Sequence, residues 1–396
     1  MKIELKKEAK KSAIVSYGTR VSIDSKNVRS VDLFYLREYL MNELGRSQVD
    51  FVTLKSKKDI SEDREYFKNI SETDLNDYDE VWCYNCTMNA FGGLIKLEAI
   101  QTFKQLVDFN GTIYYMLIDP KMPCMNFAGY VKGKMESHDG KVPTPDKDIP
   151  LYDELSYDDI KKYTDEVWPN IVIAFDGDDY EKYYKLWNKQ NARSLNKNPN
   201  GPNKIIYNKW CKLPLAEYYS VNERSDLKLK NYDNFDSKEY DLIYFGNNRN
   251  TNRNTIVKNL YDKRGNKVFI SGYDPEFKNA EYTSCSYVDH DDLFPLICKC
   301  FATVVVGDEL HNNNITTARF FESMQLDVVA FIYNKYDEEK KYIKNKELAD
   351  FIYINDANDL QEKLQKIKSD KNLYNRIVEL ERNEIQNQFG HFKKAQ

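Results

Sequence analysis

Short apolar segments alternate with segments of helical periodicity, and this alternation constrains the fold more than any other feature of the chain. In the first half, strand-like and helix-like segments occur at 11–18, 31–44, 49–54, 78–85, 94–109 and 111–119. Strands that alternate with helices along a chain form a parallel sheet with helices on both faces. The pattern therefore predicts an α/β fold built around a parallel sheet.

A second series of the same kind begins at residue 240. It continues through 267–273, 301–308, 327–333 and 350–356, and closing helices are expected from about residue 358 onward. A chain of 396 residues is long enough for two or three domains of ~100–200 residues each. We predict two Rossmann-like domains whose parallel sheets face a central cleft. Their expected bounds are 1–215 and 216–379, with 380–396 packing back on the first domain.

Composition excludes several classes of protein. The net charge of -5 argues against a uniformly basic nucleic-acid binder, so any contact with nucleic acid must use local patches. No apolar run approaches the ~18 residues of a membrane helix, and the N-terminal segment lacks the apolar region of a secretory signal. The seven cysteines have no framework spacing, so reduced thiols in a cytosol are expected. Cys83 and Cys86 form a C-x-x-C pair, for which strand packing is the favoured interpretation and a metal or redox site the alternative.

Ligands of parallel α/β sheets gather at the carboxyl ends of the strands. In the first series these ends carry Gly18, Asn85 and Asp119. A carboxylate that ends a buried strand is well placed to act as a general base, which makes Asp119 a candidate catalytic residue. The alternative is a turn, since Asp119 precedes Pro120 and such pairs commonly begin turns.

The second series offers an anion-binding pattern. One strand ends at Gly246 and is followed by Arg249 and Arg253, four residues apart. Another strand leads to Arg319 and Glu322, whose spacing of three residues places them on one helix face. Arginine forks suit a diphosphate and a carboxylate suits ribose hydroxyls, so the set predicts a nucleoside diphosphate site. The alternative is a set of solvated helix residues with a surface ion pair.

Residues 182–212 contain seven lysines, Arg193 and no acidic residue, interleaved with aromatic residues. This combination suits phosphate neutralisation and base stacking, so Lys185, Lys189 and Arg193 are candidates for nucleic-acid contact. The alternative is a solvated lysine-rich insertion. The preceding acidic run at 176–179 has the form of a metal-binding Asp-x-Asp, but helix N-capping is the favoured explanation.

Taken together, these motifs resemble the DNA β-glucosyltransferase family of T-even bacteriophages. The resemblance is carried by blocks at 74–123, 240–253, 269–282, 304–324 and 392–395. It implies the two-domain GT-B fold and transfer of a sugar from a UDP-sugar to 5-hydroxymethylcytosine in duplex DNA, with inversion. Departures from the family leave the sugar open between glucose and a pentose such as arabinose, and an already glycosylated base is an alternative acceptor.

The resemblance also implies roles for individual residues. Asp119 matches the catalytic base, while Asn89 and Phe91 match residues that enter the duplex beside a flipped base. Lys121 is expected to help bind DNA. The residues expected to bind the nucleotide sugar are Arg249, Arg253, Arg319, Glu322, Asn247, Gly246, Gly272, His290, Asp308, Gly18 and Asp32. Two of these mark departures: Asn247 replaces a serine, and Asp32 is the nearest counterpart of an acidic residue near the sugar.

The implied partners are duplex DNA and the UDP-sugar, with no membrane, in a monomer that acts in the cytoplasm of an infected bacterium. Mg²⁺ or Mn²⁺ can assist at the diphosphate without a dedicated protein cage. Two other functions stay open: a sugar transferase with a non-DNA acceptor, and a non-catalytic DNA-binding relative. A two-domain oxidoreductase is disfavoured because no G-x-G-x-x-G follows the first strand.

Overall fold

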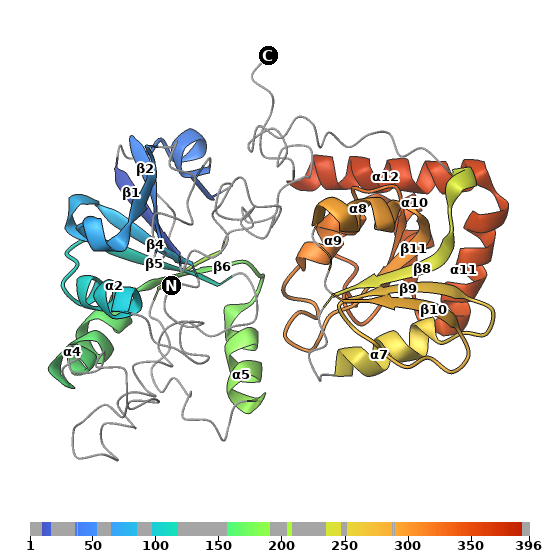
Figure 1. Ribbon diagram of the computed structural model, residues 1–396, viewed down its shortest axis with the longest axis horizontal. Helices are drawn as coiled ribbons and strands as arrows, with labels where there is room; N and C mark the ends of the chain where they lie inside the picture. Colours follow the sequence, from blue (N-terminus) through green and yellow to red (C-terminus); the bar gives the residue numbers. More distant parts are fainter. Residues whose placement is uncertain are drawn as a thin grey trace. The chain divides into compact units, whose positions relative to one another are not determined.

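The computed structural model describes residues 10–16, 36–37, 39–53, 65–84, 97–117, 157–190, 204–207, 235–246, 252–286, 288 and 290–389. The chain divides into two compact units, and the second begins at residue 212 after the first ends at 211. Each unit is built on one parallel sheet with helices beside it (Figure 1). The predicted α/β class with two parallel sheets is therefore confirmed.

The first unit contains a seven-stranded sheet in the order β3-β2-β1-β4-β5-β6-β7, in which every neighbouring pair is parallel. Its strands are β1 Lys11–Ser16, β2 Gln48–Thr53, β3 Phe67–Asn69, β4 Glu80–Tyr84, β5 Thr112–Leu117, β6 Val172–Phe175 and β7 Lys204–Tyr207. The sequence pattern predicted β1, β2, β4 and β5. It missed the other three because they have only three or four residues, too few to show a clear period.

The helices described in the first unit are α2 Leu97–Val107, α4 Tyr157–Lys162 and α5 Tyr180–Gln190. The backbone N–H of Lys182 donates to Asp179 Oδ1 at 2.9 Å, so the acidic run caps α5, as the capping interpretation predicted. Cys83 is fully buried within β4, which agrees with strand packing, and Cys86 lies outside the described residues. Short 3-10 or π turns occur at Tyr39–Glu43, Ile70–Glu72, Leu75–Asp77, Tyr163–Val167, Trp168–Asn170 and, in the second unit, Phe235–Ser237.

The second unit contains a six-stranded parallel sheet in the order β10-β9-β8-β11-β12-β13. Its strands are β8 Tyr240–Phe245, β9 Lys267–Ser271, β10 Glu281–Cys285, β11 Cys300–Val305, β12 Val329–Tyr333 and β13 Tyr353–Ile354. Its helices are α7 Asn252–Tyr261, α8 His290–Cys298, α9 Ala318–Ser323, α10 Lys346–Ile352, α11 Ala357–Ser369 and α12 Lys371–Phe389. None of the described helices combines the length and apolar character that a bilayer-spanning segment needs.

Both sheets have a topological switch point. In the second unit the chain winds outward from β8 through β9 to β10, and in the opposite direction from β11 through β12 to β13. Right-handed crossovers then place α7 and α9 on opposite faces of the sheet, as Figure 1 shows. The carboxyl ends of adjacent strands at such a point form the usual ligand crevice of an open α/β sheet. Gly246 and Val306, the first residues after β8 and β11, lie there.

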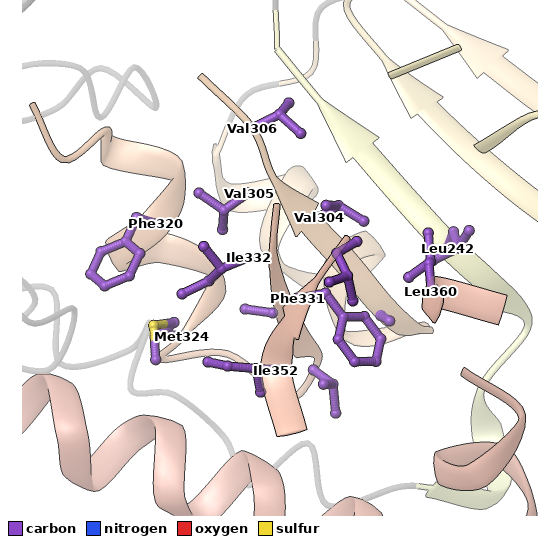
Figure 2. Close-up of a cluster of buried hydrophobic side chains, with 14 of the residues drawn as sticks. Leu242, Val304, Val305, Val306, Phe320, Met324, Phe331, Ile332, Ile352 and Leu360 are labelled. Carbon is purple, nitrogen blue, oxygen red and sulfur yellow. The ribbon is translucent and has the colours of Figure 1, made fainter. Parts of the chain in front are cut away.

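Apolar side chains from both faces of the sheet form the core of the second unit around this switch point. Figure 2 shows Val305 of β11 and Ile332 of β12 on the side of Phe320, and Val304 and Phe331 on the other side of the strands. The same core includes Ile385 of α12, which lies within the segment 380–396. Thus α12 packs in the second unit at least as far as Ile385. The predicted domain bounds and the return of the remaining C-terminal residues stay predictions.

Candidate nucleotide-binding site

About half of the predicted site residues lie outside the described part of the chain. These are Gly18, Asp32, Asn89, Phe91, Asp119, Lys121, Arg193, Asn247 and Arg249. Their assigned roles stay predictions. The described candidates gather mainly in the second unit, where the switch point of its sheet brings several of them together.

Gly246 follows β8 directly and occupies a position that requires glycine. Its φ of +147° lies where residues with a side chain rarely occur. Its N–H donates to the carbonyl oxygen of Ser271 at 3.1 Å, which keeps the end of β8 joined to β9. A Cβ atom built on Gly246 would lie 2.0 Å from Nη2 of Arg319. The missing side chain therefore leaves the space that the arginine uses.

Arg319 reaches the end of β8 from α9, 74 residues later in the chain. Its Nε donates to the carbonyl oxygen of Phe245 at 2.7 Å, and its Cζ lies 4.7 Å from the ring centroid of Tyr244. A guanidinium against an aromatic face gains cation–π attraction in addition to the hydrogen bond. These contacts hold the cation at the switch point, at the strand end before Gly246.

The start of α9 is held by two hydroxyl groups. Thr317 caps the helix, and its Oγ1 accepts from the N–H of Phe320 at 3.4 Å. The N–H of Thr317 donates to Oη of Tyr336 at 2.8 Å, and Tyr336 is fully buried. Burial raises the pKa of Tyr336 above its ordinary value, so the phenol stays protonated and can also donate to the carbonyl of Ile315. Arg319, the second residue of α9, is thereby placed in the first helical turn.

Asp308 lies three residues beyond β11 and faces a histidine. Its Oδ1 is 2.7 Å from Nδ1 of His311, and it accepts from the N–H of Leu310 at 3.1 Å. Burial alone would raise the pKa of Asp308. Other causes outweigh burial and hold this pKa below its usual value: the hydrogen bond and charge of His311, the N–H of Leu310 and the charge of Arg253. The site therefore contains a partly buried carboxylate that stays ionised at neutral pH.

Arg253 belongs to the first turn of α7 and is only 5% exposed. Its charge is one of the causes that lower the pKa of Asp308, which follows β11. Two of the three predicted arginines, Arg253 and Arg319, thus lie near the same strand ends. Glu322 is half-buried and follows Arg319 by three residues on α9, as the sequence predicted. Contact of Glu322 with a ribose stays a prediction.

The remaining described candidates occupy separate positions. Gly272 follows β9 with a φ of +80°, and its N–H donates to the carbonyl of Cys285 at 3.1 Å, so a turn explains this glycine. His290 is the first residue of α8. Lys185 and Lys189 are exposed on α5 of the first unit, where Lys185 forms a long 3.7 Å ion pair with Glu181. Exposed lysines of this kind are free to meet an external phosphate backbone.

Sequence reasoning missed several residues that shape this site, chiefly Tyr244, His311, Thr317 and Tyr336. The signal for Thr317 was available, because a threonine before a helical segment is a common N-cap. The signals for the other three were not, because their roles depend on contacts that join different strands and loops. Tyr244, for example, looks in the sequence like one more apolar residue of a buried strand.

Comparisons with known proteins agree with this architecture. Residues 10–137 match a family model described as Bacteriophage T4 beta-glucosyltransferase. The DNA beta-glucosyltransferase of Enterobacteria phage T4 is 24% identical over 373 residues, which cover 90% of this chain and 89% of that protein. The resemblance to the phage DNA β-glucosyltransferases is thereby confirmed.

Solved structures show the same fold. A point mutant of T4 phage BGT in complex with UDP-glucose has a TM-score of 0.66 and 21% identity, with 95% of each chain covered. An alpha-glucosyltransferase in complex with UDP and a 13-mer DNA has a TM-score of 0.53 and 11% identity, covering 96% of this chain and 95% of that one. These likenesses confirm the GT-B architecture of two α/β units.

Proposed function

We propose that this protein is a phage DNA-modifying glycosyltransferase. It moves a sugar, glucose or a pentose such as arabinose, from a UDP-sugar to the hydroxymethyl group of 5-hydroxymethylcytosine in duplex DNA. The observation that carries the proposal is the placement of Arg319 against Gly246 at the switch point of the second sheet. An arginine held at the carboxyl ends of the strands suits a nucleoside diphosphate, and the chain resembles a DNA glucosyltransferase over nine-tenths of its length.

The donor site belongs to the second unit. Arg253 and Arg319 supply positive charge for the two phosphates, and Arg249 is proposed as the third cation. As the bond from the sugar to UDP breaks, negative charge grows on the leaving phosphate, and fixed cations stabilise it without reorganisation. Glu322 is proposed to accept the ribose hydroxyls. Asp308, ionised and partly buried, would accept hydrogen bonds from hydroxyl groups of the donor.

The acceptor site belongs to the first unit, whose switch point lies between β1 and β4. The chain leaves β1 toward Gly18, β4 toward Asn89 and Phe91, and β5 toward Asp119. Enzymes that modify a base in duplex DNA turn it out of the stack, and Asn89 and Phe91 would occupy the gap. These positions follow the carboxyl ends of neighbouring strands, which supports the acceptor assignment.

The reaction we propose is a single displacement. Asp119 takes the proton of the hydroxymethyl oxygen, and that oxygen attacks the anomeric carbon on the side opposite UDP. The bond to the UDP oxygen breaks through an oxocarbenium-like transition state, and the configuration of the anomeric carbon inverts. The products are the glycosylated base and UDP. The chemistry requires no redox cofactor.

A divalent ion would act through the diphosphate. One related structure is T4 phage BGT in complex with UDP and Mn²⁺. Among the described residues there is no group of three or more His, Cys, Asp or Glu side chains that could cage a metal ion. Mg²⁺ and Mn²⁺ can bind phosphate oxygens with few protein ligands, so the proposed ion would arrive with the nucleotide. No step above depends on it.

DNA would approach the first unit, where α5 exposes Lys185 and Lys189. Together with Lys121 and Arg193 these cations would neutralise backbone phosphates, which supports binding to any sequence. We propose that the protein acts as a monomer in the cytoplasm of the infected bacterium, where the phage genome is exposed to host nucleases.

The proposal is tested by UDP release. UDP-glucose is incubated with a duplex containing hydroxymethylcytosine, or with the same duplex containing cytosine, and UDP is measured with time. We expect release only with the modified duplex, and none with Asp119→Ala, while UDP still binds that variant with near-normal affinity. Equal release with both duplexes indicates hydrolysis or another acceptor, and a near-normal rate for Asp119→Ala shows that the base is assigned wrongly.

A further inference from the structure

The hydroxyl of Tyr244 is buried without a hydrogen-bond partner among the described residues. Tyr244 is fully buried in β8, and its Oη is closed off from solvent. A buried hydroxyl that makes no hydrogen bond destabilises a fold, because the water it has lost is not replaced. Such groups in a native protein call for an explanation, and a bound ligand is one.

A neighbouring tyrosine shows that this part of the sheet can satisfy a buried hydroxyl. Tyr261 of α7 is also fully buried, and its ring lies 6.0 Å from that of Tyr244, edge to face. Its Oη donates to the carbonyl of Ile243 at 2.9 Å and accepts from the N–H of Val304 at 2.9 Å. Both tyrosines are fully buried, but only the hydroxyl of Tyr261 forms hydrogen bonds with described residues.

The unsatisfied hydroxyl points toward the space above Gly246. A Cβ atom built on Gly246 would lie 3.4 Å from Oη of Tyr244 and 2.0 Å from Nη2 of Arg319. An oxygen atom of a ligand near this point could accept a hydrogen bond from the phenol and from the guanidinium at once. The hydrogen bond from Nε of Arg319 to the carbonyl of Phe245 keeps the guanidinium at this point.

We propose that Tyr244 is a further ligand-binding residue, whose hydroxyl donates a hydrogen bond to a phosphate oxygen of the nucleoside diphosphate beside Arg319. This inference rests on the proposed function of the same site. The phosphate oxygen lies beside the guanidinium of Arg319, within reach of the hydroxyl of Tyr244. The ring of Tyr244 supports the cation, and its hydroxyl adds a donor to the oxyanion.

The pair Tyr244→Phe and Tyr261→Phe separates this role from a structural one. Each change removes one buried hydroxyl and keeps the ring, and only the Tyr261 hydroxyl has protein partners among the described residues. Affinity for UDP and for uridine is measured by calorimetry, and Tm by thermal unfolding. For Tyr244→Phe we expect an unchanged or higher Tm, about tenfold weaker UDP binding and unchanged uridine binding. For Tyr261→Phe we expect a lower Tm and UDP affinity within about twofold of wild type.

Three outcomes overturn the inference. Tyr244→Phe that binds UDP as tightly as wild type shows that the hydroxyl does not touch the ligand. Loss of uridine affinity equal to the loss of UDP affinity places the hydroxyl away from the phosphates. A wild-type protein that binds neither UDP nor UDP-glucose overturns the proposed function itself, and this inference with it, so the two failures are distinguishable.

Discussion

The guanidinium of Arg319 occupies the space in which a side chain on Gly246 would lie, although 73 positions separate the two residues along the chain. The approach is so close that a Cβ would meet Nη2 at 2.0 Å. Because Gly246 has no side chain, the guanidinium of Arg319 can lie against it. The guanidinium in turn donates a hydrogen bond to the last residue of β8, Phe245. The donor site proposed here depends on this relationship.

The first prediction concerns Gly246→Ala. The added methyl group displaces the guanidinium of Arg319, so UDP affinity should fall about tenfold or more. Adding a side chain at a φ of +147° also costs about 1–3 kcal/mol of strain. Calorimetry with UDP measures the first effect and urea unfolding the second.

Gly265→Ala is the matched control for strain. Gly265 also has a positive φ, +89°, but it is exposed and a Cβ there would meet no atom within 4 Å. This variant should lose stability and keep its affinity for UDP. If Gly246→Ala binds UDP no more weakly than Gly265→Ala, the close approach of Arg319 is unimportant for the ligand.

The second prediction is that Arg319→Ala weakens UDP binding by roughly ten- to hundredfold, because a charge-assisted fork to phosphate is lost. The effect should shrink for uridine, which carries no phosphate. Arg264→Ala, a change at an exposed arginine in the turn after α7, serves as the control and should bind UDP normally. An equal loss for UDP and uridine would indicate that Arg319 acts through folding of the unit.

The third prediction uses the pH dependence of stability. The folded pKa of Asp308 is depressed, so its ionised form stabilises the fold above the unfolded pKa, ~3.9 for aspartate, and this contribution is lost as pH falls through the folded value. Urea unfolding of wild type and Asp308→Asn between pH 3 and 7 should show a difference that is constant above pH ~4 and declines below it.

His311 provides the internal control for that experiment. His311→Leu removes the hydrogen bond to Asp308 and should raise the pKa of Asp308. Burial raises this pKa, and in the variant the hydrogen bond no longer counteracts it. In that background the effect of Asp308→Asn should be smaller, and its decline below pH ~4 should be complete at a higher pH than in wild type. A pH profile that is identical in both backgrounds would show that His311 does not hold the carboxylate in its ionised form.

The fourth prediction concerns the exposed lysines of α5. The double variant Lys185→Ala, Lys189→Ala should bind duplex DNA more weakly at every sequence, and the slope of log affinity against log salt should fall by about 2. Affinity for UDP should not change. The control is Lys335→Ala with Lys346→Ala, two exposed lysines of the second unit. Equal loss of DNA binding in both double variants would point to general charge rather than to a site on α5.

The sequence pattern was most informative where strands are long and apolar. It placed β1, β2, β4 and β5 of the first sheet and β8, β9, β11 and β12 of the second. It placed Gly246 and Asp308 at strand ends, whereas both lie beyond the last residues of β8 and β11. It could not show β7, since Lys204–Tyr207 has only two aliphatic residues inside a lysine-rich stretch. A short strand such as β7 forms because it pairs with a neighbouring strand, and the local sequence pattern does not show that pairing.

Within the site, residue types were predictable and their contacts were not. A three-residue spacing put Arg319 and Glu322 on one helix face, because helix geometry is local. The contact of Arg319 with Phe245 and Gly246, and that of Thr317 with Tyr336, depend on how separate strands and loops meet in the folded sheet. The burial of the Tyr244 hydroxyl beside Gly246 and Arg319 likewise depends on the folded structure, so the local sequence pattern could not predict it.

The measurement that tests the central claim most directly is mass spectrometry of a hydroxymethylcytosine duplex after incubation with the protein and a panel of UDP-sugars. Digestion to nucleosides assigns any mass increment to the modified base. The account predicts one hexose or pentose increment on hydroxymethylcytosine, with a single preferred donor and none on cytosine. No increment with any donor, on the hydroxymethylated duplex or on one already glucosylated, would contradict it.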